Sequence, residues 1–227
     1  MKKNSYIGIT FIILVFGIYA VPKIVERFKN GNTIEQRKSL KPDTDLAFLN
    51  INDTLKKMPD FTFRNQDSLL ISRSDFNGMV YVVDFFFTSC PSICPVMTKN
   101  LTLIEKEYGD REDFGIASFS ITPDIDSPMI LKKYAERYGV TSLNWHFLTQ
   151  EDQDVYELSN KGLNIFTGIN PEVEGGFEHQ GFFALIDKNG YIRSRKDEHG
   201  NPIVYYQGTE AEQVEWIKED IKKLLAE

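Results

Sequence analysis

The chain has 227 residues, 41% of them hydrophobic, which is enough for one buried core once a short terminal segment is set aside. Its formal net charge is -7, and because the first 30 residues carry +4, the remaining residues carry -11. Phosphate binding needs clustered Lys and Arg, so this acidic remainder argues against nucleic acid as a partner. An acidic surface suits a cationic or metal-bearing partner, but it most often serves solubility.

The N-terminus contains an apolar run from Tyr6 to Val21 that holds no charge and has basic residues on both sides. A helix through this run, with a few flanking positions, reaches the lower end of the roughly 17 to 25 residues that cross a bilayer. A cleaved signal peptide is the alternative, but bulky Ile18 stands where such a peptide prefers a small residue. We therefore expect residues 1–28 to form an uncleaved transmembrane anchor, with the rest of the chain on the exported side, periplasmic or equivalent.

Residues 29–57 are mostly polar and lack a sustained apolar period, which predicts a tether. From residue 58 the pattern changes to short apolar runs that alternate with helical periods. We predict a hairpin from 61–63 and 69–71, strands at 79–87, 114–121, 145–148, 182–187 and 191–193, and helices at 96–108, 127–138, 151–161 and 210–225. Ser127 is the expected N-cap of the second helix.

The run at 79–87 is almost entirely β-branched and aromatic, as in a strand buried on both faces of a sheet that helices cover. A turn at Asp187–Gly190 predicts a closing hairpin between the last two strands. Alternating strands and helices with such a hairpin indicate an α/β three-layer sandwich with a mixed central sheet. Residues 58–227 are thus expected to form one domain with a thioredoxin-like fold.

The chain has two cysteines, Cys90 and Cys94, at the end of the most apolar strand and the start of a helix. A helix N-terminus stabilises a thiolate, so at least one of the two should have a depressed pKa. Two such sulfurs can close a disulfide or hold a soft metal together. A structural disulfide is the plainest interpretation in an exported protein, although so short a loop would gain little stability from it.

The spacing of the cysteines differs by one residue from the Cys-x-x-Cys of redox thioredoxins. The segment Cys90-Pro91-Ser92-Ile93-Cys94-Pro95 resembles the Cys-Pro-x-x-Cys-Pro signature of the SCO/SenC family. The resemblance continues in order through residues 121–128, 144–149 and 178–187 and covers about 58–225. It implies a thioredoxin-like domain that binds copper and helps to deliver it to the binuclear copper site of cytochrome c oxidase, through the copper-bearing subunit or another cuproprotein.

The resemblance also implies a histidine as third ligand just before a late strand, where His179 stands. Cys90, Cys94 and His179 together suit Cu(I), and Cu(II) with an added weak ligand. His146 lies within a strand pattern and is expected to be packed, whereas His199 lies in a polar turn and is expected to be solvated. Glycines 175, 176 and 181 should give the His179 loop room to move toward the cysteines.

Three functions remain open at this point. The first is a copper metallochaperone, which is not an enzyme. The second is a membrane-anchored thiol-disulfide reductase that uses Cys90 and Cys94, although the 179–181 segment lacks the proline common beside the cysteines of redox thioredoxins. A peroxidase is the weakest. Its nucleophilic cysteine would need an activating arginine close by, and the basic residue nearest to the cysteine motif in sequence is Lys99. Asp124 and Asp126 suit an outer-shell or docking role, but turns and caps explain them equally well.

Overall fold

The computed structural model describes residues 14–19, 21–22, 46–150, 155–173 and 175–227. The chain divides into two compact units, residues 1–44 and 45–227. In the first unit, residues 14–19 and 21–22 are helical, and most of the expected anchor and tether lies outside the described residues. Within the described part of the chain, no helix has both the length and the apolar character needed to cross a membrane.

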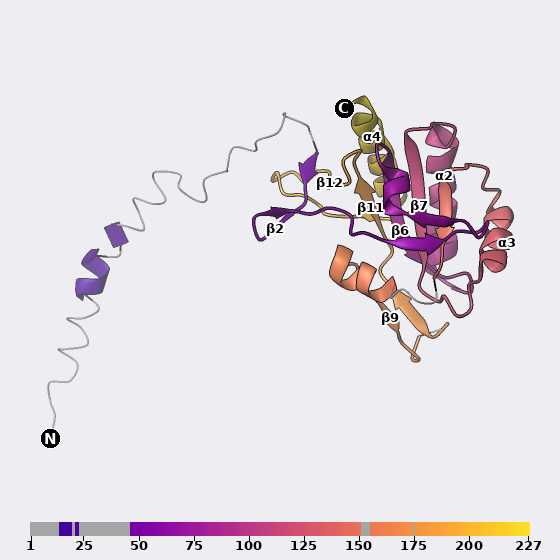
Figure 1. Ribbon diagram of the computed structural model, residues 1–227. Helices are drawn as coiled ribbons and strands as arrows, with labels where there is room; N and C mark the ends of the chain where they lie inside the picture. Colours follow the sequence, from indigo (N-terminus) through magenta and orange to yellow (C-terminus); the bar gives the residue numbers. More distant parts are fainter. Residues whose placement is uncertain (1–13, 20, 23–45, 151–154, 174) are drawn as a thin grey trace, which may run out of the picture. The chain divides into compact units, whose positions relative to one another are not determined.

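The second unit is built on a mixed sheet, as the sequence predicts (Figure 1). Its parallel centre consists of β6 (Val80–Phe86), β7 (Phe114–Ser120) and β8 (Trp145–Leu148), and every residue of β6 and β7 is buried. On the other side of β6, β11 (Phe182–Ile186) is antiparallel, followed by β12 (Ile192–Ser194) and β1 (Ala47–Phe48). A short strand, β13 (Tyr206–Gln207), also pairs with β11.

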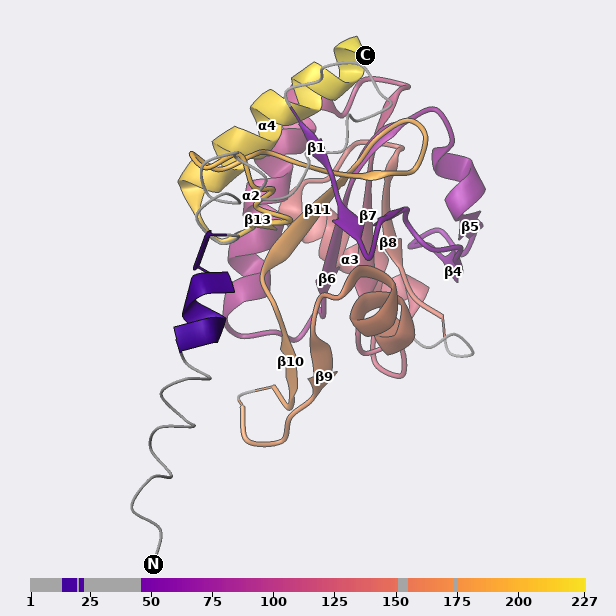
Figure 2. The same cartoon turned by 90° about the vertical axis from the view of Figure 1, so that its left-hand side faces the viewer.

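Three helices lie beside this sheet, and α2 (Ile93–Tyr108) contacts both α3 (Pro128–Tyr138) and α4 (Ala211–Ala226) (Figure 2). Ser127 is the N-cap of α3 and Pro128 its first residue, as expected, although the Ser127 side chain makes no capping hydrogen bond. The apolar stripe of α4 is buried through Val214, Ile217, Ile221 and Leu224, as its helical period predicts.

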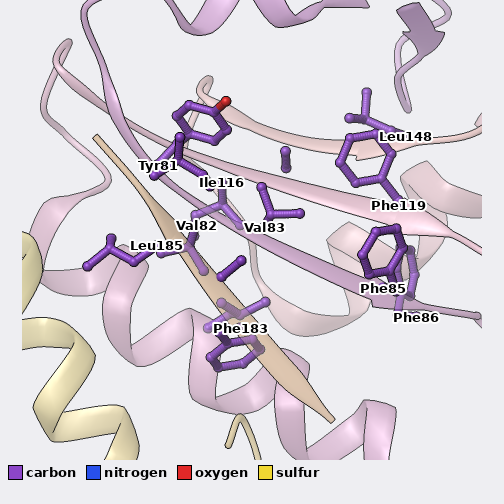
Figure 3. Packing of buried hydrophobic residues seen from close by; sticks show 14 of the residues in the cluster. Tyr81, Val82, Val83, Phe85, Phe86, Ile116, Phe119, Leu148, Phe183 and Leu185 are labelled. Carbon is purple, nitrogen blue, oxygen red and sulfur yellow. The ribbon is translucent and has the colours of Figure 1, made fainter. Parts of the chain in front are cut away.

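Phe85 and Phe86, which are neighbours in β6, belong to the cluster of buried hydrophobic residues drawn in Figure 3, and their rings contact different elements. Phe86 contacts Tyr134 of α3, with ring centroids 5.3 Å apart. Phe85 contacts Phe119 of β7, and Phe119 in turn meets Phe61 and Phe63 edge-on, with centroids 5.0 and 5.1 Å apart. Phe63 belongs to the predicted hairpin, formed by β4 (Thr62–Arg64) and β5 (Leu70–Ser72) and followed by the 3-10 turn η1 (Arg73–Phe76). The core therefore continues on both sides of the sheet.

Residues 46–57, which the sequence analysis assigns to the tether, belong to the folded unit. They contain β1 and a small hairpin of β2 (Asn50–Ile51) and β3 (Thr54–Leu55). The buried Arg193 holds the entry to β1, because its Nη2 donates to the Leu46 carbonyl at 3.3 Å and its guanidinium lies 4.0 Å from the centroid of Phe48. Strands of two residues are too short to show a period, so the pattern could not reveal them.

The helix expected at 151–161 also differs. Residues 151–154 lie outside the described part of the chain, and residues 155–156 are helical and lead into a π-helix, η2 (Glu157–Leu163). The segment ends at Asn164, whose φ of 56° is left-handed. It leads into β9 (Thr167–Ile169), which pairs with β10 (Phe177–His179) as a hairpin apart from the main sheet.

Candidate metal centre

The two cysteines occupy the strand-to-helix corner that the sequence predicts. Cys90 lies in the loop after β6 and Cys94 in the first turn of α2. Neither forms a disulfide, and both are buried, with Cys90 8% and Cys94 0% exposed. The Cys94 backbone N–H donates to the Cys90 sulfur at 3.5 Å. This amide lies in the first turn of the helix, where backbone N–H groups have no acceptor within the helix itself.

His179 approaches the cysteines from the other side of the corner, as expected. Its Nε2 lies 2.9 Å from the Cys94 sulfur, and one ligand atom from each of Cys90, Cys94 and His179 lies within 4.8 Å of the others. His179 is the last residue of β10 and is followed closely by β11, the neighbour of β6. It stands on a short strand of a separate hairpin and not in the predicted loop, because its pairing with Thr167 extends the hairpin to this position.

The second ring nitrogen of His179 indicates how the imidazole is oriented. Nδ1 lies 3.2 Å from the carbonyl oxygen of Gln180, which can only accept a hydrogen bond. We therefore assign the proton to Nδ1, which leaves the lone pair of Nε2 directed at the sulfurs. A backbone carbonyl on the far nitrogen is a common outer partner of a metal-binding histidine.

Aromatic side chains enclose the cluster on one side. Phe87 meets the His179 ring edge-on, with centroids 6.0 Å apart, and packs against Phe177 at 5.7 Å. A small cavity of about 190 Å³ opens here and is lined by Phe87, Cys90, Ser92, Ile93, Val173, Phe177, Glu178 and His179. A larger hollow of about 400 Å³ lies beside η2, but no Cys or His lines it, so the chemistry belongs to the smaller cavity.

The glycine-rich end of the β9–β10 hairpin rests on the cysteine loop. Gly175 has a φ of 93°, and a Cβ there would come within 3.2 Å of Phe87 and 3.3 Å of Pro91. The glycine pattern in the sequence predicts room for the His179 segment to move. At Gly175 the structure shows a close approach that only glycine allows without displacing its neighbours.

The two thiols differ strongly in acidity. The pKa of Cys90 is lowered to about 3, chiefly by a hydrogen bond from Cys94 and further by backbone N–H groups, against the opposing effect of burial. The pKa of Cys94 is raised, first by burial and then by its hydrogen bond and charge interaction with Cys90. One depressed pKa was expected from the helix N-terminus; the neighbouring thiol is the larger cause. The pair is thus a thiolate beside a neutral thiol.

This asymmetry predicts how copper binding depends on pH. Cys90 is ionised well below neutrality, so coordination by both sulfurs requires the loss of the Cys94 proton alone. We expect about one proton to be released per Cu(I) bound, and copper affinity to rise about tenfold per pH unit through the neutral range. Competition titration with a Cu(I) chelator at several pH values measures the slope. A pH-independent affinity would contradict the assignment of a protonated Cys94.

The other two histidines lie elsewhere and behave as predicted. His146 is half-buried on β8, where Nδ1 lies 3.3 Å from the Asn65 amide nitrogen and the ring meets Phe76 edge-on at 5.7 Å. His199 is exposed in its turn, 3.4 Å from Glu198. Neither approaches the cysteines closely enough to join the cluster that the described residues form.

Sequence reasoning missed an ionisable residue in the core, Asp84 of β6. It is 1% exposed, burial raises its pKa to about 7, and it accepts a hydrogen bond from Ser118 Oγ at 2.5 Å. Trp145 Nε1 donates to the same hydroxyl at 3.0 Å. The apolar character of the surrounding run concealed Asp84, although a lone carboxyl in such a run is itself a signal of a buried polar group.

Fold and site together define a thioredoxin-like domain with a Cys-Cys-His cluster at its strand-to-helix corner. The SCO1/SenC family model matches residues 50–212, and the chain belongs to this family. It is 38% identical over 146 residues to the SCO1 protein homolog of Bacillus subtilis, a match that covers 63% of this chain and 75% of that protein.

Two solved structures are similar to this chain in fold. BsSco, described as a member of the Sco family of cytochrome c oxidase assembly proteins with a disulfide switch, shares 31% identity at a TM-score of 0.63, over 79% of this chain and 96% of that one. Copper-bound ScoI of Bradyrhizobium japonicum has the same fold at 16% identity and a TM-score of 0.54, over 74% of this chain and 99% of that one.

Proposed function

We propose that this protein is a copper metallochaperone that delivers copper to a cuproprotein, the binuclear copper site of cytochrome c oxidase being the acceptor. The observation that carries the proposal is the convergence of the ligand atoms of Cys90, Cys94 and His179 within 4.8 Å. Membership of the SCO1/SenC family and the similarity to BsSco, from a family described by its role in cytochrome c oxidase assembly, support the choice of acceptor.

The donor set suits copper chemically. Two thiolate sulfurs and one imidazole match Cu(I), which is soft and accepts three ligands, and an added weak ligand would accommodate Cu(II). The cavity lined by Cys90 and His179 gives an acceptor's ligands access to the metal, although Cys94 itself is buried. Copper then passes by exchange of ligands, one at a time, and the protein acts without catalytic turnover.

A second proposed function is thiol-disulfide reduction of the acceptor's cysteines, which copper loading itself requires. A low-pKa thiolate at Cys90 next to a neutral thiol at Cys94 is the arrangement of a dithiol reductant, and this observation favours the alternative. The peroxidase proposal remains the weakest, since the basic residue nearest to the cysteine motif in sequence is Lys99.

The amount of copper that the reduced protein binds separates the first two proposals. We expect the purified, reduced chain to hold one copper under anaerobic conditions in the presence of a competing chelator. Metal analysis alongside a thiol assay makes the measurement. A protein that takes up no copper but exchanges its disulfide readily would contradict the chaperone proposal and support the reductase.

We also propose that the N-terminal segment anchors the protein in a membrane with its folded unit on the exported side. The uncharged run from Tyr6 to Val21 between basic residues supports this. Cell fractionation should place the intact chain with membranes, whereas a chain beginning near Asn30 should be released. A mature N-terminus at Val21 in mass spectrometry would show instead that the segment is a cleaved signal.

A further inference from the structure

A buried carboxylate, Asp126, lies behind the cysteine loop. It belongs to the segment between β7 and α3, where its neighbours Asp124, Ile125 and Ser127 are exposed, yet Asp126 itself is 0% exposed. A carboxylate removed from water in this way must be satisfied by hydrogen-bond donors. The positions of those donors in the fold show which segments Asp126 connects.

Four donors converge on Asp126. The Thr88 backbone N–H donates to Oδ2 at 3.1 Å, and the Thr88 hydroxyl donates to Oδ1 at 2.5 Å. The hydroxyls of Ser120 and Thr122 donate to Oδ2 at 2.6 and 2.9 Å. Ser120 is the last residue of β7 and Thr122 lies just after this strand, whereas Thr88 lies in the loop after β6. Asp126 therefore ties the cysteine loop to the end of β7.

This tie bears on one of the two cysteines in particular. Thr88 is two residues before Cys90, whose own N–H donates to the Phe87 carbonyl at 3.2 Å. Cys94, in contrast, is built into α2 and takes its position from the helix. The place of the Cys90 sulfur relative to Cys94 and His179 thus depends on the loop that Asp126 holds.

We propose that Asp126 is a positioning residue of the metal centre: through Thr88 it fixes Cys90 at the spacing that joint coordination with Cys94 and His179 requires. Asp126 does not touch the metal. The copper side of this inference rests on the proposed function, but the same placement governs how readily Cys90 and Cys94 form a disulfide, which needs no copper.

Asparagine is the informative replacement at Asp126. It keeps one carbonyl oxygen for the Thr88 N–H, which can only donate, and its amide group faces the Thr88 hydroxyl, which is able to turn and accept. The variant should therefore fold, while the charge-assisted bonds to the loop become weaker. Asp124→Asn is the matched control, because it makes the same change two residues away at an exposed side chain.

Thr88 supplies a second, independent pair of variants. Thr88→Val removes the hydroxyl donor and keeps the shape, and Thr88→Ser restores a hydroxyl. If Asp126 acts through Thr88, Thr88→Val should reproduce the Asp126→Asn effect and Thr88→Ser should reverse it. This pair also keeps the inference testable should Asp126→Asn fail to fold.

The experiment measures Cu(I) affinity by chelator competition, the Cu(II)–thiolate absorption spectrum, and the dithiol–disulfide equilibrium against reduced and oxidised glutathione, for the intact chain and its variants. Outer partners of metal sites are worth about 10- to 100-fold in affinity. We expect a loss in this range and a shifted spectrum for Asp126→Asn and Thr88→Val, and changes within about twofold for Asp124→Asn and Thr88→Ser.

Unchanged copper affinity in Asp126→Asn, or an equal loss in Asp124→Asn, would overturn the inference. A loss that disappears once the unfolded fraction from denaturant titration is subtracted would also overturn it, because Asp126 would then serve stability alone. If the wild type binds no copper, the proposed function fails by itself, and the glutathione equilibrium decides: a shift of about tenfold or more in Asp126→Asn sustains the positioning role, and no shift removes it.

Discussion

Replacing His179 with alanine should weaken Cu(I) binding by more than the 10- to 100-fold or so that an outer partner contributes, because it removes a ligand. Nε2 lies 2.9 Å from the Cys94 sulfur, and the Nδ1 contact with the Gln180 carbonyl directs the Nε2 lone pair toward the cluster. Disulfide formation should persist, since the imidazole takes no part in sulfur exchange. Chelator competition and a glutathione equilibrium measure the two properties in the same preparation.

His199→Ala is the matched control for this variant, because it deletes an exposed imidazole in a turn apart from the cysteines. Its copper affinity should equal that of the wild type. Equal affinities in the His179→Ala protein and the wild type would remove His179 from the metal centre. Loss of the disulfide together with copper would show that His179 supports the fold of the corner and not the metal.

Serine in place of either cysteine should abolish both copper binding at chelator-limited concentrations and the intramolecular disulfide, because each function needs two sulfurs. The two variants should nevertheless differ in their remaining thiol. In Cys94→Ser the low-pKa Cys90 remains, and the serine hydroxyl can still donate to it; in Cys90→Ser only the buried Cys94, with its raised pKa, remains. Cys94→Ser protein should therefore be alkylated much faster at neutral pH.

Alkylation by iodoacetamide, followed by mass spectrometry, tests this asymmetry with the double serine variant as the blank. The rate for Cys94→Ser should change little between mildly acidic and neutral pH, because Cys90 stays ionised over this window. Faster alkylation of the Cys90→Ser protein would reverse the assignment of thiolate and thiol. Copper retained by either single variant would show that one sulfur and His179 are sufficient.

The sequence predicted the centre of the fold because its signals are long and unambiguous there. The apolar run at 79–87 became β6, buried at every position, and the helical stripe at 210–225 became α4. The short edge strand β1 was missed, because it depends on pairing with β12 and on contact with Arg193. Its two residues are too few to show the alternation of apolar and polar residues that predicts a strand. Contacts with residues distant in sequence determine whether such short segments form strands, and the local sequence pattern does not predict these contacts.

The site was predictable to a similar, partial extent. Local spacing placed Cys90 and Cys94 at a strand-to-helix corner, but His179 is 85 residues away from Cys94, and only the family resemblance singled it out. Asp126 was noticed as an acid near a turn, yet its burial and its bonds to Thr88 depend on how the ends of β6 and β7 meet. The sequence pattern does not show that the ends of these two strands lie next to each other.

Copper delivery is tested most directly by the copper content of cytochrome c oxidase purified from cells that carry either wild-type protein or His179→Ala, with His199→Ala as control. If the protein delivers copper through the Cys-Cys-His centre, the oxidase from His179→Ala cells should lack copper at its binuclear site, although the variant still forms its disulfide. Fully loaded oxidase in those cells, at the same protein level and without added copper, would contradict delivery of copper by this centre.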